Sequence, residues 1–292
     1  MNIKKRNLLN ALLFISPWII GFALFTAYPL FSSLYYSLTD YNLISEPTFI
    51  GLDNYKQLFL EDDFFYKVLG NTMYMIFIGL TVTTIVTIFI SIMLNNKHVK
   101  GMSFFRIVFF IPTLVPFVVL SILWIWILQP DSGVVNSILG FIGIEGPGWF
   151  ASPTWSKPAF ILMAIWMSGN MILIYLAGLS DIPQSLYEAA SIDGASSIQK
   201  VFHVTLPMLR PAILFNIITG IIGVFQSFAE SFIITNGGPD GSTTFYSLYL
   251  YQNAFQYFKM GYASAMAWIL LVIALSFTAV FFHLSKKWGM EG

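Results

Sequence analysis

The sequence contains no cysteine and very little charge. Without a thiol, the chain has no disulfide and no thiolate metal site. Charged residues make up 10% of the 292 residues, whereas a soluble domain carries about 25%. Hydrophobic residues make up 57%, so the composition predicts an integral membrane protein. The formal net charge of zero argues against a nucleic-acid partner.

Motifs for nucleotide and metal chemistry are also missing. No glycine is followed by lysine, which excludes a G-x-x-x-x-G-K-[ST] phosphate-binding loop, and no H-E-x-x-H pattern occurs. His98, His203 and His283 are far apart in sequence and lie near basic membrane edges, which favours interfacial polar residues over metal ligands. We therefore predict no catalytic residue, metal site or cofactor on this chain. A transport cycle driven by ATP would need ATP and Mg²⁺ on a separate ATPase subunit.

Long apolar runs predict six membrane-spanning helices in an all-α bundle, which forms a single domain over residues 1–292. The apolar run after the basic N-terminus is too long for the core of a cleaved signal peptide. Prolines at positions 29, 112 and 116 predict bends in the first and third spans. We place the spans at residues 11–38, 68–94, 107–128, 159–179, 212–234 and 263–284.

Basic residues gather on one side of these spans. The N-terminus, the 95–106 loop, the 181–211 loop and the C-terminal tail hold 10 of the 14 Lys and Arg residues: Lys4, Lys5, Arg6, Lys97, Lys100, Arg106, Lys200, Arg210, Lys286 and Lys287. Cytoplasmic loops of membrane proteins carry an excess of Lys and Arg. We therefore expect both termini and the 181–211 loop to be cytoplasmic.

The stretch from Asp181 to Pro211 is too polar to lie in hydrocarbon, and it begins with a helix signal. Asp181 and Gln184 have the spacing of a capping box, and Pro183 fits a first helical turn. The dipeptide Asp193-Gly194 predicts a turn, because glycine accepts a positive φ without strain.

A second short helix is predicted after this turn. Ser196 or Ser197 can cap its start, and Pro207 and Pro211 bring it to an end. Two short helices joined at a glycine elbow form a knob between membrane spans, which suits the docking of a partner protein.

The residues of this knob resemble the EAA loop of bacterial ATP-binding-cassette importer permeases. In that family the loop forms coupling helices that dock into a groove on a cytoplasmic ATPase. The resemblance therefore implies a role in ATPase coupling for Glu188, Ala189, Ala190, Asp193, Gly194, Ala195, Phe202, Leu206 and Pro207. It also implies that the loop lies between the fourth and fifth spans on the cytoplasmic side.

Further segments resemble the first permease subunit of carbohydrate importers in the same superfamily. They are FIGLDNYKQLF (49–59), YLAGLSDIP (175–183), TNGGP (235–239) and MGYASAMAW (260–268). This ordered series implies a multi-pass permease of the bacterial cytoplasmic membrane that imports a di- or oligosaccharide. The implied partners are a second, homologous permease, two ATP-binding-cassette ATPases and an extracytoplasmic sugar-binding protein. Unlike the larger maltose permease, the sequence has no large inserted outer domain and no N-terminal extension, so contacts with the binding protein would come from shorter loops.

Polar residues in the fourth and fifth spans predict a substrate path. Glu230 is the one acid within a predicted span, and an ionisable residue there is a functional candidate. On a continuous helix, Glu230 shares a face with Asn216, Gly220, Gly223 and Ser227. Aromatic rings with amides and carboxylates suit sugars, whose C–H faces stack on rings and whose hydroxyls need donors and acceptors. The alternative is a helix–helix seam in which Glu230 bonds a neighbouring helix.

Trp166 and Asn170 are four residues apart in the fourth span and would also share a helical face. Gln226 lies beside the polar face of the fifth span. The predicted substrate-path residues are therefore Glu230, Gln226, Ser227, Asn170 and Trp166.

The outer loops 129–157 and 237–262 hold more Trp, Tyr, Gly and Pro than a connector needs. They indicate either a surface for the binding protein or interfacial aromatic anchors.

Two other functional classes also stay open. An ion-gradient-driven secondary carrier for a small polar solute predicts inverted repeats, broken helices and autonomous transport. A membrane scaffold or sensor predicts association without flux. The EAA pattern favours the importer over both.

Overall fold

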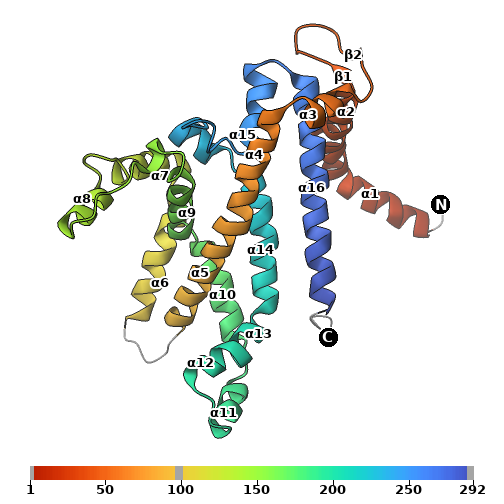
Figure 1. The fold of residues 1–292 in the computed structure, drawn as a ribbon. Helices are drawn as coiled ribbons and strands as arrows, with labels where there is room; N and C mark the ends of the chain where they lie inside the picture. The colour runs from red at the N-terminus through yellow and green to blue at the C-terminus, as the bar shows by residue number, and fades with distance from the viewer. Residues whose placement is uncertain (1–2, 96–100, 288–292) are drawn as a thin grey trace. The chain divides into compact units, whose positions relative to one another are not determined.

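The structure is a computed structural model that describes residues 3–95 and 101–287, with side chains described over residues 11–95 and 101–283. Lys97, His98 and Lys100 lie outside the described residues, as do the side chains of the basic residues at both ends. The predicted helical class is confirmed for the described chain (Figure 1), apart from one short two-stranded ribbon that the sequence did not predict. Intrachain contacts divide the chain into two units, Met1–Asp63 with Leu250–Val272 and Phe64–Tyr249 with Ile273–Gly292. The single domain over residues 1–292 stays a prediction.

The first unit combines the first predicted span with the start of the last one. Pro29 has no N–H to donate to a carbonyl in the preceding turn, and a π-helical turn at Ala23–Ala27 precedes it. The sequence predicted a bend at Pro29; the structure has a widened π-helical turn before it, and Ala11–Ser37 counts as one helix rather than as a bent pair. The elements of this unit are α1 (Ile3–Phe22), α2 (Tyr28–Ser37), β1 (Thr39–Asp40), β2 (Thr48–Phe49), α3 (Asp53–Leu60), a π-helical turn at Gln252–Gln256 and the beginning of α16 (Met260–Lys287).

Hydrogen bonds hold the ribbon segment against α3 and against the start of α16. The Asn54 side-chain amide donates to the carbonyls of Ser37 and Thr39, each at 2.9 Å. Gly261 N–H donates to the Tyr41 carbonyl at 3.0 Å, and a Cβ at Gly261 would overlap the Thr39 carbonyl oxygen. This close approach requires glycine at position 261, and it ties residues distant in sequence into one unit.

The second unit contains the remaining helices. Its elements are α4 (Asp63–Tyr74), α5 (Thr81–Leu94), α6 (Met102–Phe110), α7 (Phe117–Ile127), α8 (Val134–Phe141), α9 (Ser156–Trp166), α10 (Gly169–Ser180), α11 (Gln184–Ile192), α12 (Ser197–Lys200), α13 (Leu206–Met208), α14 (Arg210–Phe225), α15 (Tyr246–Tyr251) and the end of α16. Short π-helical turns lie at Met75–Leu80, Val201–Thr205 and Ser231–Thr235, and 3₁₀ turns lie at Ile111–Leu114 and Trp149–Ala151.

Three described helices are long and apolar enough to cross a membrane, at Ala11–Ser37, Asp63–Leu94 and Met260–His283. Three bent helix pairs also qualify by composition, which gives up to six crossings. One pair is α6 and α7, bent by 105° around Pro112 and Pro116. The predicted bend at these prolines is confirmed, and it is so large that α6 and α7 do not form one straight span.

The fourth and fifth spans are not continuous helices, so the predicted shared faces do not extend across the breaks, although Asn216, Gly220 and Gly223 remain together on α14. The helix axis turns by 49° between α9 and α10, where Ser168 Oγ bonds the Ile165 carbonyl at 2.6 Å. The α14 helix ends at Phe225, where the N–H groups of Gln226 and Ser227 bond carbonyls three residues back. Such short-range bonds close a helix end, so Glu230 does not share a continuous helix with Gly220 and Gly223.

Close packing around Gly169 fixes the start of α10. A Cβ at this position would lie 2.7 Å from the Phe109 carbonyl oxygen and 3.1 Å from Phe110 Cα, so backbone atoms would have to move. We expect Gly169→Val to destabilise the protein, because overpacking costs about 1–3 kcal/mol. The measurement is the temperature at which half of the detergent-purified protein stays monodisperse.

Gly140→Val is the matched control for this substitution, because a Cβ on that helical glycine meets no atom within 4 Å. It should lower the midpoint temperature less than Gly169→Val does. Equal midpoints for the two variants would contradict the packing argument.

Candidate functional site

A cavity of 290 Å³ lies within the second unit, between the π-helical turn before α5, the α9–α10 break and the end of α14. We call it the interspan cavity. Its apolar wall includes Met75, Phe160, Met163 and Phe245. Its polar and small lining residues are Gly79, Thr83, Ser168, Asn170, Gly220, Gly223, Ser227 and Glu230. A largely apolar cavity with a few convergent polar groups is the usual form of a small-molecule site.

The interspan cavity brings together three of the five predicted substrate-path residues. Glu230 is half-buried, and its Oε2 accepts a hydrogen bond from Ser227 Oγ at 2.8 Å. Among the described residues, no cation and no group from another helix bonds the Glu230 carboxylate. Asn170 is exposed towards the cavity from the first turn of α10. This geometry favours a lining role for Glu230 over a hydrogen-bonded helix seam.

The other two predicted residues lie outside the interspan cavity. Trp166 packs edge-on against Trp124, with ring centroids 5.7 Å apart. Gln226 is exposed at the end of α14. Asn216, which the sequence placed on the same polar face, is buried and contacts the Met171 carbonyl at 3.4 Å, so it belongs to the packing between α10 and α14.

Sequence reasoning missed Thr83. The hydroxyls of Thr87 and Ser91, which also lie on α5, donate to carbonyls one turn earlier at 2.7 Å. Thr83 is 5% exposed and lines the cavity, yet its Oγ1 has no hydrogen-bond partner within the described ranges. A buried hydroxyl without a partner costs free energy, and a hydroxylated ligand in the cavity would satisfy it. No signal in the sequence separates Thr83 from the threonines around it.

The wall at Phe245 is held by the segment Thr235–Thr244. Thr243 Oγ1 donates to the Gly238 carbonyl at 2.7 Å, and the Asn71 amide donates to the Gly241 carbonyl at 2.8 Å. Lys157 Nζ bonds Asn71 Oδ1 and the Ser242 carbonyl, each at 3.1 Å. The bonds to Gly241 and Ser242 fix the segment Thr235–Thr244 on α4 and α9. Phe245 follows this segment and packs against Phe160 at 5.7 Å between ring centroids.

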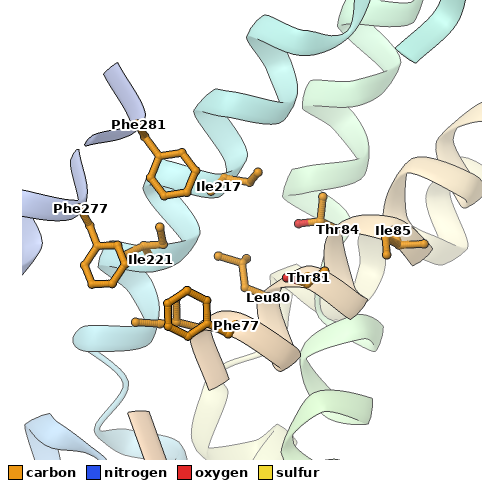
Figure 2. A pocket seen from close by; sticks show the side chains of 10 residues that line it. Phe77, Leu80, Thr81, Thr84, Ile85, Ile217, Ile221, Phe277 and Phe281 are labelled. Atoms are coloured by element: carbon orange, nitrogen blue, oxygen red, sulfur yellow. The ribbon is translucent and has the colours of Figure 1, made fainter. Parts of the chain in front are cut away.

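A second pocket in this unit has different chemistry. It measures 160 Å³, and Figure 2 shows its walls, with Ile217 and Ile221 on α14 and Phe277 and Phe281 on α16. The polar groups that line it are the hydroxyls of Thr81 and Thr84, with no carboxylate or amide. The pocket is therefore a poor match for a sugar, which needs several donors and acceptors.

The predicted knob is present as two helices around an elbow. Gly194 has a φ of +77°, which confirms the predicted glycine turn. Ser196 caps α12 through a capping box with Gln199: Gln199 N–H donates to Ser196 Oγ at 3.3 Å, and Ser196 N–H donates to Gln199 Oε1 at 2.7 Å. The capping box predicted at Asp181 is wrong, because α11 begins at Gln184 with Pro183 at the cap position and no side-chain cap.

The sequence predicted that Pro207 and Pro211 end the second helix of the knob, and the structure confirms this only for Pro211. Pro211 lies in the first turn of α14, where the axis turns by 64° after Met208, so a helix end near Pro211 is confirmed. Pro207 lies within α13 instead of ending a helix. A π-helical turn at Val201–Thr205 precedes it, because proline cannot donate to the preceding turn.

Hydrogen bonds connect the parts of the knob, and its surface exposes apolar and acidic side chains. Lys200 Nζ donates to Ser191 Oγ at 2.7 Å across the elbow, and Tyr187 OH and Thr205 Oγ1 lie 3.0 Å apart. A hollow of 280 Å³ opens beside Asp193 and Gly194. Exposed apolar side chains around it are Ile192 (87%), Ile198 (71%) and Phe202 (62%).

The predicted coupling residues are spread over this knob. Glu188 and Ala189 are exposed on α11, and Ala190, Asp193, Gly194 and Ala195 line the hollow. Leu206 and Pro207 are half-buried at its base. Exposed apolar side chains on a polar knob are typical of a protein-docking surface.

Comparisons with known proteins agree with this arrangement. Residues 87–289 match the family of binding-protein-dependent transport system inner membrane components. The chain is 42% identical over 291 residues to the probable ABC transporter permease protein YesP of Bacillus subtilis (strain 168), covering 98% of this chain and 93% of the relative. It is 34% identical over 295 residues to the lactose transport system permease protein LacF of Rhizobium radiobacter, covering 98% of each.

A solved structure is also similar over the full length. It is a bacterial alginate ABC transporter in complex with an alginate pentasaccharide-bound periplasmic protein. The TM-score is 0.84 at 26% identity, with coverage of 100% of this chain and 98% of the other. The chain therefore belongs to the family of inner membrane components of binding-protein-dependent transport systems.

Proposed function

We propose that this chain is the membrane-spanning permease subunit of an ATP-driven importer for a di- or oligosaccharide. The observation that carries the proposal is the interspan cavity, where Thr83, Asn170 and Glu230 offer hydrogen-bonding groups within an apolar wall. The proposal is supported by relatives named as permeases for lactose and arabinooligosaccharides. Six crossings with both termini in the cytoplasm agree with the distribution of Lys and Arg.

The partners follow from the same proposal. The knob would dock on a cytoplasmic ATPase through Phe202 and the exposed α11 face, while a second, homologous permease completes the membrane part. Two ATPases would bind ATP and Mg²⁺, and an extracytoplasmic sugar-binding protein would deliver the substrate. This last partner is supported by the similar transporter solved with a periplasmic protein. Nucleotide-dependent motion of the knob would then shift the spans between inward- and outward-open states.

The test is reconstitution of the complete complex in liposomes. We expect a stable assembly with a second permease and an ATPase, whose ATP hydrolysis rises when one sugar-loaded binding protein is added. Broken helices such as α9–α10 also occur in ion-gradient-driven secondary carriers. Uptake by the chain alone, dependent on an ion gradient and independent of ATP, would overturn the importer in favour of such a carrier.

Glu230 provides a sharper test of the path. We expect Glu230→Ala to lower sugar uptake about 2- to 10-fold, because one lost hydrogen bond costs about 0.5–1.5 kcal/mol. The measurement is initial uptake of radiolabelled sugar per assembled complex. Glu230→Gln, which retains an acceptor, should keep most of the activity. Normal uptake in Glu230→Ala would remove Glu230 from the path, and loss of the assembled complex in both variants would favour a structural role.

A further inference from the structure

A second cavity with polar chemistry lies in the first unit and has no role in the function proposed above. It measures 440 Å³ and lies between the ribbon segment after α2, the α3 helix and the segment before α16. We call it the Tyr41–Tyr257 cavity after two of its lining residues. Its volume falls within the range of about 300–1,000 Å³ that is usual for small-molecule sites. In the proposed orientation it lies on the outer side, where the first span ends and the last one begins.

A buried amide with a fixed orientation lines this cavity. Asn54 is 7% exposed, and its Nδ2 uses both hydrogens on the Ser37 and Thr39 carbonyls. Its Oδ1 receives no hydrogen bond from any residue in the described part of the chain. Because the two bonds prevent the amide from turning, Asn54 presents one pre-oriented acceptor, which suits a ligand hydroxyl.

Further polar groups give this cavity both hydrogen-bond donors and acceptors, and charges of both signs. Gln57 lies three residues after Asn54 on α3, and its side chain makes no hydrogen bond within residues 3–95 and 101–287. Asp40 adds one carboxylate, and Lys259 adds one ammonium group. One charge of each sign leaves the lining without net charge, so the cavity suits a neutral polyhydroxylated ligand better than an ion.

Aromatic rings supply the remaining part of a sugar site. Tyr41 stacks on Tyr36 with ring centroids 4.7 Å apart and planes at 24°, which holds the Tyr41 ring in place. Tyr257 and Phe258 are 56% and 50% exposed. Phe258 has a φ of +55°, a strained conformation for a bulky residue and one that clusters at ligand sites. Exposed rings beside a fixed one can stack on the C–H face of a pyranose.

We propose that the Tyr41–Tyr257 cavity binds one glycosyl unit of a neutral oligosaccharide. Its hydroxyls would bond Asn54 and Gln57, and its C–H face would pack on the tyrosine rings. This inference rests on the proposed import of sugar, and it adds a subsite separate from the interspan cavity. Such a subsite would retain an oligosaccharide on the outer side after the binding protein releases it.

The test measures sugar binding by the assembled complex in lipid nanodiscs without the binding protein. Maltotriose, cellotriose, xylotriose and arabinotriose are the probes, and saturation-transfer difference NMR is the readout because it detects weak binding. We expect a signal from at least one trisaccharide. The signal should fall at least threefold in Gln57→Ala and in Tyr257→Ala.

Lys56→Ala is the matched control, because Lys56 is the exposed neighbour of Gln57 on α3 and does not line the cavity. It should leave the signal unchanged. The proposal is overturned if none of the four probes gives a signal, or if the signal is the same in wild type and Gln57→Ala. A third result also overturns it. Gln57→Ala could leave sugar binding unchanged and alter only the concentration of binding protein needed for half-maximal ATPase stimulation. That result would identify Gln57 as a contact with the binding protein.

The same preparation separates this inference from the proposed function. ATP hydrolysis stimulated by a loaded binding protein, together with an unchanged NMR signal in Gln57→Ala, would remove the subsite and leave the importer intact. Absence of stimulation by any loaded binding protein would instead count against the importer.

Discussion

Gly194→Val is expected to lower sugar uptake at least tenfold while the chain still inserts and assembles. The φ of +77° at Gly194 lies in the left-handed region, which costs an L-residue about 1–2 kcal/mol and a β-branched residue more. A change of 1–2 kcal/mol alters an equilibrium by a factor of about 5–30. The strain would therefore favour a different angle between α11 and α12. Uptake and binding-protein-stimulated ATP hydrolysis, both per assembled complex, measure the effect.

The matched variant is Gly194→Asn. A Cβ at this position meets no atom within 4 Å, so added bulk does not clash within the chain. Asparagine accepts a left-handed backbone more readily than valine does, so Gly194→Asn should keep most of the uptake. Loss of uptake in both variants would assign the effect to bulk on the surface that faces the ATPase. Normal uptake in Gly194→Val at normal expression would refute the role of the elbow.

Gly223→Trp is expected to block transport, with at least a tenfold loss of uptake. Gly223 lines the interspan cavity, and a Cβ there has no neighbour within 4 Å, so a large side chain would project into open space. The cavity measures 290 Å³, and an indole would occupy much of the room for a glycosyl unit. Because an added Cβ at Gly223 meets no atom, we expect folding and assembly to be retained. Initial uptake per assembled complex is the measurement.

Gly70→Trp serves as the control for Gly223→Trp. Gly70 is also a helical glycine with no atom within 4 Å of an added Cβ, and it does not line the interspan cavity. It should leave uptake within about twofold of wild type, as surface substitutions usually change stability by less than 0.5 kcal/mol. Equal inhibition by both tryptophans, or normal uptake with Gly223→Trp, would show that the cavity is not on the path.

Local sequence signals predicted the knob well. The elbow at Gly194 and the helix cap, which the sequence placed at Ser196 or Ser197 and the structure has at Ser196, depend on bonds between residues at most a few positions apart. Proline at positions 112 and 116 likewise predicted a bend, because a missing N–H acts within one helical turn. The cap at Asp181 failed because Pro183, one residue before Gln184, already fixes an extended backbone at the start of α11.

The candidate path was predicted less well, because the argument assumed continuous helices. Trp166 and Asn170 separate at the break after Met167, and Trp166 turns to Trp124 instead of the cavity. Ser227 reaches the cavity from the non-helical segment after α14, and Glu230 reaches it from the residue before the π-helical turn at Ser231–Thr235, not from the face of α14 on which they were placed. Polar side chains that bond their own neighbourhood can end a helix within an apolar run, and periodicity does not detect this.

The sequence by itself determined that the chain is a membrane protein, approximately where its apolar helices lie, and that a glycine elbow projects between two of them. Composition and bonds within one or two helical turns decide these features. Only the tertiary structure decided which polar groups meet. Thr83, Asn170 and Glu230 come from three separate segments, and Tyr41 and Tyr257 line one cavity although they are far apart in the sequence. Such convergence depends on helix breaks and on close backbone approaches, as at Gly169 and Gly261, which form only when distant segments pack together.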